Sequence, residues 1–274
     1  MRILQPLPPL EVPTQKTIER IVRFLKREFK KRKKTRAILG ISGGLDSAVT
    51  AIFCKKAGLD LYPVLLPYGK HFSRDLSDAK KLLKFLKIDK KKIIKIDISP
   101  LVNFQIKSIG RKIKLDKIAR GNIIARQRMI ILYALSNQLG GLVVGTGNLS
   151  EYLLGYFTLH GDGAWDINPL ARLFKTQIFE LAKFLGVPKE IISKKSTAGL
   201  WPGQTDEGEL GFSYQDADPI LYFSIIKKIP KEKLARIYHL NKNLMEKVLK
   251  RVKETEYKRQ AIKTIDKQHT RSHK

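Results

Sequence analysis

The stretch RAILGISGGLDS at residues 36–47 joins an apolar segment to a glycine-rich turn, and AVTAIFCKK follows it at 48–56. The segment 36–41 is typical of a short buried strand, and 48–56 of the helix after it. Glycines between a strand and a helix leave backbone N–H groups free at the positive helix end, which favours phosphate binding. The turn lacks the lysine of the common phosphate loop GxxxxGK[ST], so it belongs to a different class of loop. A carboxylate beside it, Asp46, indicates a divalent cation between carboxylate and phosphate.

The composition is that of an ordinary globular protein except for its charge. Among 274 residues, 54 lysines and arginines stand against 25 acidic residues, a formal net charge of +29. This charge favours anionic ligands and leaves nucleic acid open as a partner, although no recognisable nucleic-acid module accompanies the spread of basic residues. No apolar run approaches the ~20 residues that span a bilayer, and the N-terminal residues show no secretory pattern. The single cysteine, Cys54, excludes an internal disulfide, so we expect a cytoplasmic protein.

Strand-like apolar segments alternate with helical patterns over the first 150 residues, which predicts parallel βαβ units. We expect an α/β fold: a Rossmann-like parallel sheet with helices on both faces, followed by a helical C-terminal part. A single domain is expected over 1–274, with flexible tails at 1–13 and about 262–274, and ligands at the carboxyl ends of the first and fourth strands. Strands are expected at 36–41, 59–66, 92–98 and 142–146. Helices are expected at 14–34, 48–56, 74–86, 116–139, 173–185, 188–194, 216–228, 231–239 and 241–258, with a long loop at 196–214.

Seven motifs follow one another along the chain, and together they resemble the ammonia-dependent NAD synthetases of the N-type ATP pyrophosphatase group. They are GISGGLDS (40–47), GNIIARQRM (121–129), VVGTGNLSE (143–151), GYFTLHGDGAWDINPLARLFKT (155–176), KKSTAGLW (194–201), GQTDEGELGFSY (203–214) and EYKR (256–259). The resemblance covers roughly 15–260 and implies the adenine nucleotide alpha-hydrolase-like fold. It also implies ATP and Mg²⁺ as cofactors, and deamido-NAD and ammonia as substrates. In that family ATP adenylates the nicotinate carboxylate, and ammonia then displaces AMP to form the amide.

The same resemblance implies roles for individual residues. ATP binding is implied for Gly40, Ile41, Ser42, Gly43, Gly44, Leu45, Asp46, Ser47, Thr146, Lys175 and Thr197. Metal binding is implied for Asp46 and Glu151. Binding of deamido-NAD is implied for Arg126, Leu159, Asp166, Tyr257 and Lys258. The catalytic candidates are Asp46, Asp166 and Asp162, the last of which either helps the attack of ammonia or caps a turn.

Plainer interpretations of some of these residues stay open. Asn148 and Glu151 have the spacing of a helix capping pair, and the acidic run at 206–209 fits a capped helix start as well as a second metal. Leu159 stands where the family commonly has lysine, and Tyr257 where it commonly has histidine. ATP activation is therefore better supported than recognition of deamido-NAD.

Two other functions also remain open. The SGGxDS loop could adenylate another carboxylic acid or a tRNA base, and a chain this basic could be a nucleic-acid-binding protein with a non-catalytic nucleotide site. The family implies a homodimer, for which the helices at 14–34 and 116–139 offer apolar surface. Nothing resembles a glutaminase, so we expect free ammonia, or a separate amidotransferase, as the nitrogen source.

Overall fold

The computed structural model describes residues 10–69, 73–237 and 241–260. The tail expected at 262–274, and the part of the tail at 1–13 that ends at residue 9, lie outside these residues. Residues 10–13 have no regular structure, and the carbonyl oxygen of Glu11 accepts a hydrogen bond from Gln177 Nε2 at 3.0 Å. In the described part of the chain, no helix has the length and apolar character that a bilayer span requires.

A four-stranded parallel sheet forms the centre of the fold, in the order β3-β2-β1-β4. The strand with the glycine-rich turn at its end is therefore internal, paired with β2 on one side (Ala37 opposite Leu61) and β4 on the other (Ala37 opposite Leu142). The strands are β1 (Arg36–Gly40), β2 (Asp60–Leu65), β3 (Ile94–Lys95) and β4 (Leu142–Val143).

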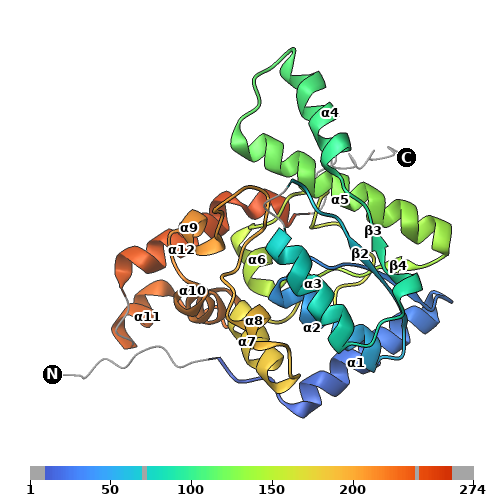
Figure 1. Ribbon diagram of the computed structural model, residues 1–274. Coiled ribbons are helices and arrows are strands. Elements are labelled where there is room, and N and C mark those ends of the chain that lie inside the picture. The colour runs from blue at the N-terminus through green and yellow to red at the C-terminus, as the bar shows by residue number, and fades with distance from the viewer. Residues whose placement is uncertain (1–9, 70–72, 238–240, 261–274) are drawn as a thin grey trace, which may run out of the picture.

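Helices cover both faces of the sheet because its strands are apolar on both sides (Figure 1). Ala37 and Leu39 of β1 belong to one buried cluster, and Ile38 between them belongs to the other, as the two-residue period of a strand requires. The first face packs against α1 (Gln15–Lys31), α2 (Leu45–Lys56), α3 (Ser73–Phe85) and α7 (Lys175–Phe184). The second packs against α4 (Ser99–Gly110) and α5 (Lys117–Leu139). The predicted Rossmann-like arrangement is confirmed.

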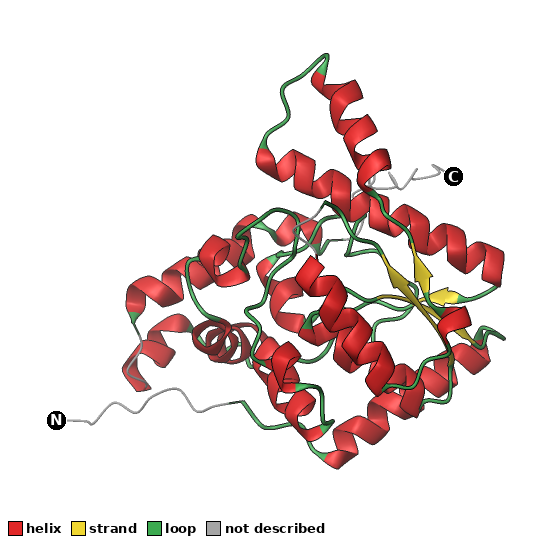
Figure 2. Ribbon diagram, in the orientation of Figure 1, coloured by secondary structure: helices red, strands yellow, loops and turns green. Residues whose placement is uncertain are grey.

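The C-terminal part is helical, as predicted, and has a core of its own. Leu154, Phe174, Tyr214 and Leu221 are among its buried residues, and none of the residues that the structure describes in this region forms a strand (Figure 2). Its helices are α6 (Leu149–Leu154), α9 (Asp206–Leu210), α10 (Tyr214–Leu221), α11 (Lys231–Ile237) and α12 (Lys242–Glu254). The short helix α8 (Lys189–Ile192) instead buries Ile191 in the first core, next to α2 and α7. Short π and 3₁₀ turns follow α10 at Tyr222–Ile226 and α12 at Glu256–Lys258.

Several element boundaries differ from the prediction. The helix α4 was not predicted, because Leu101 and Phe104 are exposed and blur its amphipathic pattern. Its start does carry a local signal, since Asp97 Oδ1 accepts the Ser99 N–H at 2.9 Å just before a proline. The long helix predicted at 216–228 is α10 followed by the π turn, and the predicted loop at 196–214 contains α9.

Candidate active site

A cavity of about 1030 Å³ opens at the carboxyl ends of β1, β2 and β4. The glycine-rich turn after β1 and the segment after β4 line one side, and loops of the helical C-terminal part line the other. The site is thus built between the sheet and the helical part, which is where open parallel sheets bind their ligands.

The glycine-rich turn is held in shape by its own serines. Ser47 Oγ donates to the Gly44 carbonyl at 3.0 Å, and the Gly44 N–H donates to Ser42 Oγ at 3.2 Å. The two hydroxyl oxygens lie 3.1 Å apart. Because α2 begins at Leu45, not at the predicted residue 48, Asp46 and Ser47 belong to its first turn. The turn therefore presents a fixed surface at the positive end of the helix dipole.

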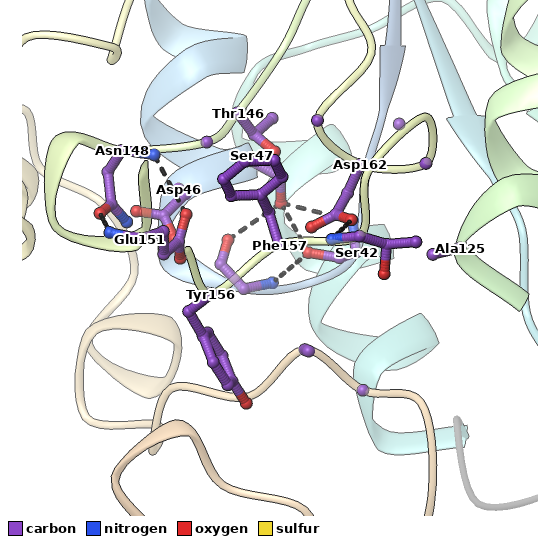
Figure 3. Close-up of a pocket in the computed structure, with 18 of the residues that line it drawn as sticks. Ser42, Asp46, Ser47, Ala125, Thr146, Asn148, Glu151, Tyr156, Phe157 and Asp162 are labelled. Carbon is purple, nitrogen blue, oxygen red and sulfur yellow. Dashed lines mark hydrogen bonds between the residues drawn. The ribbon is translucent and has the colours of Figure 1, made fainter. Parts of the chain in front are cut away.

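Asp46 faces a buried lysine from the helical side of the cavity. Lys175 Nζ lies 2.5 Å from Asp46 Oδ2 and 3.7 Å from Glu151 Oε1, and Lys175 is only 3% exposed. Asp46 and Glu151 stand side by side in Figure 3. Burial alone would lower the pKa of the Lys175 ammonium, but nearby carboxylates, Asp46 and Glu151 first among them, outweigh burial and raise the pKa. Lys175 is therefore charged at neutral pH.

Glu151 uses its two oxygens for different purposes. Oε2 accepts the Asn148 N–H at 3.0 Å, while Asn148 Oδ1 accepts the Glu151 N–H at 2.9 Å, which completes the capping box at the start of α6. Oε1 remains directed at Lys175. Burial, and then the neighbouring Asp46, raise the pKa of the Glu151 carboxyl well above its usual value, and Lys175 opposes them. Capping and a role in the cavity are therefore compatible.

The opposite end of the cavity is formed by α5 and the turn at 155–165. Arg126 Nε donates to the carbonyl oxygen of Leu159 at 3.2 Å, and Asn122 Oδ1 accepts the Thr158 hydroxyl at 2.8 Å. Two residues one helical turn apart on α5 thus hold this turn. Asp162 Oδ1 accepts the Thr158 N–H at 2.8 Å. Asp162 opens on the cavity, but the surrounding walls desolvate its carboxyl and raise its pKa (Figure 3).

Lys258 closes the same turn from the C-terminal side. Its ammonium donates to the carbonyl oxygens of Gly155 at 2.8 Å and Phe157 at 2.7 Å, and it lies 5.2 Å from the centre of the Phe157 ring. Burial lowers the pKa of Lys258. Lys258 is the last residue of the 3₁₀ turn Glu256–Lys258. It is the residue of the EYKR motif that lines the cavity.

The residues named from the sequence differ in their position relative to the cavity. Those that line it, besides most of the glycine-rich turn, are Thr146, Glu151, Leu159, Asp162, Lys175, Thr197 and Lys258. Thr197 also accepts a backbone N–H two residues ahead at 3.0 Å, as a turn residue does. Arg126, Asp166 and Tyr257 are not among the lining residues. Asp166 Oδ2 instead accepts the backbone N–H of Val143 at 2.8 Å, and Tyr257 is 64% exposed.

Lys194 lines the cavity as well, although no role was predicted for it. Its ammonium pairs with Asp75 and Asp78 of α3, the latter at 3.0 Å, and lies 3.4 Å from the Gly43 carbonyl oxygen. It therefore joins the loop after α8 to the glycine-rich turn. The motif KKSTAGLW contains it, but in a chain with this many lysines the motif alone did not single it out.

Asp218 anchors the helices that carry the site. Its carboxylate accepts the Ser150 hydroxyl at 2.6 Å, and the N–H and hydroxyl of Thr176 at 2.9 and 2.8 Å. Residues adjacent to Glu151 and Lys175 are thus tied to α10. Burial raises the pKa of Asp218 to about 6, although these hydrogen bonds lower it.

The raised pKa of Asp218 gives a pH-dependent stability. An unfolded aspartate ionises near pH ~3.9, so between about pH 4 and 6 the folded state binds more protons than the unfolded state. The free energy of unfolding should therefore fall as pH rises through this window, by up to about 3 kcal/mol from this residue. Urea unfolding at pH 4 to 7 should show a smaller fall in Asp218→Asn, and an equal fall in both proteins would contradict the assignment.

The parallel sheet, the glycine-rich turn before α2 and the cavity at the strand ends define an α/β protein of the adenine nucleotide alpha-hydrolase-like fold. Residues 17–262 match the family model described as NAD synthase. The chain belongs to the NAD synthase family.

The similar proteins found match nearly the whole length of this chain. The NH(3)-dependent NAD(+) synthetase of Pyrococcus furiosus is 42% identical over 247 residues, 89% of this chain and 92% of that protein. Among solved structures, the NMN synthetase of Francisella tularensis has a TM-score of 0.82 at 33% identity and covers 93% of this chain and 100% of its own. The NH3-dependent NAD synthetase of Campylobacter jejuni has a TM-score of 0.76 at 30% identity, with 92% and 99% covered.

Proposed function

We propose that the chain catalyses the ATP-dependent amidation of deamido-NAD by ammonia, giving NAD, AMP and pyrophosphate. The observation that supports this most is a single cavity that runs from the turn containing Ser42 and Ser47 to the wall containing Asp162 and Lys258. Its volume of about 1030 Å³ is at the upper end of small-molecule sites, roughly 300–1,000 Å³, as a site for two reacting nucleotides needs. The activity printed for the 42% identical relative from Pyrococcus furiosus agrees.

We assign the ATP phosphates to the first turn of α2 and to Lys175. The same place fits a divalent cation, because Asp46 Oδ1 is buried without a hydrogen-bond partner in the described structure and Glu151 Oε1 faces the same lysine. Carboxylate oxygens beside phosphate are the ligands that Mg²⁺ prefers. Held by Asp46 and Glu151, Mg²⁺ would neutralise the charge that develops on pyrophosphate.

The chemistry proceeds in two displacements. A carboxylate oxygen of deamido-NAD forms a bond to the α-phosphorus of ATP, and the bond from that phosphorus to the pyrophosphate oxygen breaks. Ammonia then forms the C–N bond at the activated acyl carbon, the C–O bond to AMP breaks, and the nitrogen loses a proton. We assign Asp162 to receive this proton, since its carboxyl lines the cavity and its surroundings raise its pKa.

An isotope experiment tests this sequence of bonds. Deamido-NAD labelled with ¹⁸O in its nicotinate carboxylate should transfer one ¹⁸O atom to AMP and none to pyrophosphate, read by mass spectrometry. Label found in inorganic phosphate together with ADP would mean activation at a terminal phosphorus, and would overturn the acyl-adenylate.

Leu159 and Tyr257 provide a test of substrate recognition. Both lie on the side of Lys258, where the family commonly has lysine and histidine. The double variant Leu159→Lys, Tyr257→His should lower the KM for deamido-NAD about tenfold, because a hydrogen bond to a charged group contributes about 1.5–3 kcal/mol. The KM for ATP should not change. Steady-state kinetics with deamido-NAD and, in parallel, deamido-NMN provide the measurement, and a wild-type preference for the mononucleotide would contradict the proposed substrate.

We further propose that the chain forms a homodimer through α4 and α5. These helices project from the body of the molecule (Figure 1). Apolar side chains are exposed on and between them: Leu101, Phe104, Ile109, Ile113, Ile118 and Ile130. The helix α1, the other candidate from the sequence, buries Ile18, Leu25 and Phe29 in the protein's own core instead. Arg126 and Tyr257 are assigned to deamido-NAD but do not line the cavity of a single chain. A second copy that packs near the turn held by Arg126 would explain this.

The dimer can be tested at Phe104, which is 72% exposed on α4. Phe104→Asp should give a monomer in sedimentation velocity at concentrations where the wild type is dimeric, because a charge at the centre of an apolar interface is left unpaired. Phe184→Asp, an exposed aromatic on α7, is the matched control and should remain dimeric. A monomeric wild type would refute the proposal.

We place the enzyme in the cytoplasm, and the proposed reaction requires no nucleic acid. Cys54 is buried in the first core, and burial raises the pKa of its thiol to about 12, which suits an inert thiol in a reducing compartment. The alternatives of a tRNA-modifying enzyme or a nucleic-acid-binding protein are not favoured, because the family match extends over residues 17–262.

A further inference from the structure

Two carboxylates contact Lys175, and with a third in the same wall of the cavity they give its pocket an excess of negative charge. Lys175 Nζ contacts Asp46 and Glu151, and the charge of Asp206 acts on Lys175 and on Glu151. These acids come from three elements, α2, α6 and α9, and all line the cavity. One ammonium against three carboxylates leaves two negative charges uncompensated when all are ionised, which is costly in a desolvated wall.

Two oxygens of this group also lack a donor. Within the described residues, Asp46 Oδ1 and Asp206 Oδ1 are buried and have no hydrogen-bond partner, and Asp206 as a whole is 2% exposed. The other Asp206 oxygen accepts the Tyr214 hydroxyl at 3.1 Å, which fixes the carboxylate. The Tyr214 ring also lies 5.6 Å from Lys175 Nζ, so Tyr214 links the carboxylate of Asp206 to the pocket of the lysine. Buried carboxylate oxygens without a donor are rare, and a hard cation is the ligand that satisfies them.

The acids around Lys175 are not already arranged as a metal site. No three acidic, histidine or cysteine side chains in the described ranges are already spaced to hold a metal ion. The ammonium, 2.5 Å from Asp46 and 3.7 Å from Glu151, occupies the place that a cation shared by them would take.

We propose that Lys175 holds the place of a divalent cation among Asp46, Glu151 and Asp206, and that the cation binds these carboxylates when the ammonium leaves. The inference rests on the proposed function for Asp46 and Glu151, and adds Asp206 as a third carboxylate. Its consequence is an order of binding: the free enzyme takes up metal poorly, because the lysine competes. ATP phosphates draw the ammonium away and bring the metal with them.

Lys175→Met, similar in length and uncharged, tests the competition without any turnover. The probe is Mn²⁺ added to the nucleotide-free protein, with free Mn²⁺ measured by electron paramagnetic resonance. The variant should bind Mn²⁺ at least about tenfold more tightly than the wild type, equivalent to 1.4 kcal/mol. Its melting temperature, lowered by the unpaired carboxylates, should be largely restored by millimolar Mg²⁺, whereas that of the wild type should not move. A variant that binds Mn²⁺ no better than the wild type would overturn the proposal.

Asp206→Asn tests the third carboxylate and covers the case in which Lys175→Met does not fold. With an ATP analogue that has a methylene bridge between the α- and β-phosphorus, the variant should bind Mn²⁺ at least about fivefold more weakly, equivalent to roughly 1 kcal/mol. Glu207→Gln, an exposed neighbour on the same helix, should bind as the wild type does. Equal affinities of the two variants would remove Asp206 from the site. If the wild type forms NAD but Lys175→Met gains no metal affinity, this inference alone is refuted. If Lys175→Met gains metal affinity but the wild type forms no NAD, the proposed function alone is refuted.

Discussion

Asp46→Asn is expected to reduce NAD formation about 10³-fold, because a metal-bound carboxylate supplies several kcal/mol of transition-state stabilisation. The change is isosteric and leaves an oxygen that can still accept from Lys175, so the fold should persist. Asp46 stands in the first turn of α2, directly at the glycine-rich turn and 2.5 Å from the lysine assigned to phosphate. The loss should therefore appear in kcat, measured at saturating ATP, deamido-NAD and ammonium.

The control for Asp46→Asn is the same kind of change at a surface acid. Glu180→Gln on α7 breaks only an exposed pair with Lys183 and should retain full activity. Circular dichroism must show both variants folded. An Asp46→Asn protein that is folded and keeps more than a tenth of wild-type kcat would contradict the metal role of this carboxylate.

Gly43→Ala is expected to be the most damaging of the small substitutions. Gly43 has φ +78°, a conformation unfavourable for alanine, and a Cβ there would overlap the Asp75 carbonyl oxygen at the start of α3. Relief of this overlap must move the turn or the helix, and a displacement of about 1 Å at a reacting centre costs about 10²-fold in rate. We expect kcat/KM for ATP to fall by this factor, with a lower melting temperature.

The variant Gly58→Ala separates the effect of the backbone conformation from the effect of the overlap with Asp75. Gly58 has φ +70° but open space around its Cα, so Gly58→Ala has the strain of the left-handed conformation without the overlap. That strain costs roughly 1–2 kcal/mol of stability, and activity should be unchanged because Gly58 lies at the other end of α2. Equal activity losses in the two variants would show that the contact between Gly43 and α3 does not position the turn.

The strand, turn and helix of 36–56 could be predicted because local signals agree there. The apolar run of β1 has partners on both faces, and the glycines mark its end. The helix α4 lacked such agreement, since Leu101 and Phe104 point to the surface and belong to no core. The strand β4 is shorter than the predicted 142–146 because Val144 pairs with Ile167 only as an isolated bridge, a contact across 23 residues.

In the candidate site, too, contacts between residues close together in the sequence could be predicted, and contacts between distant residues could not. The capping pair Asn148 and Glu151 could be read from spacing, because both partners lie in one helical turn. The pairing of Lys175 with Asp46 crosses 129 residues, and no local pattern in a chain with 54 basic residues indicates which lysine it is. The resemblance to NAD synthetases identified Lys175, but only the packing of α7 against α2 brings its ammonium to the carboxylates.

A product assay tests the proposed reaction itself. The wild-type chain is incubated with ATP, Mg²⁺, ammonium and deamido-NAD, and NAD, AMP and pyrophosphate are separated by chromatography. One AMP and one pyrophosphate are expected for each NAD formed. ATP consumption without NAD, or NAD accompanied by ADP and phosphate, would contradict the proposed reaction.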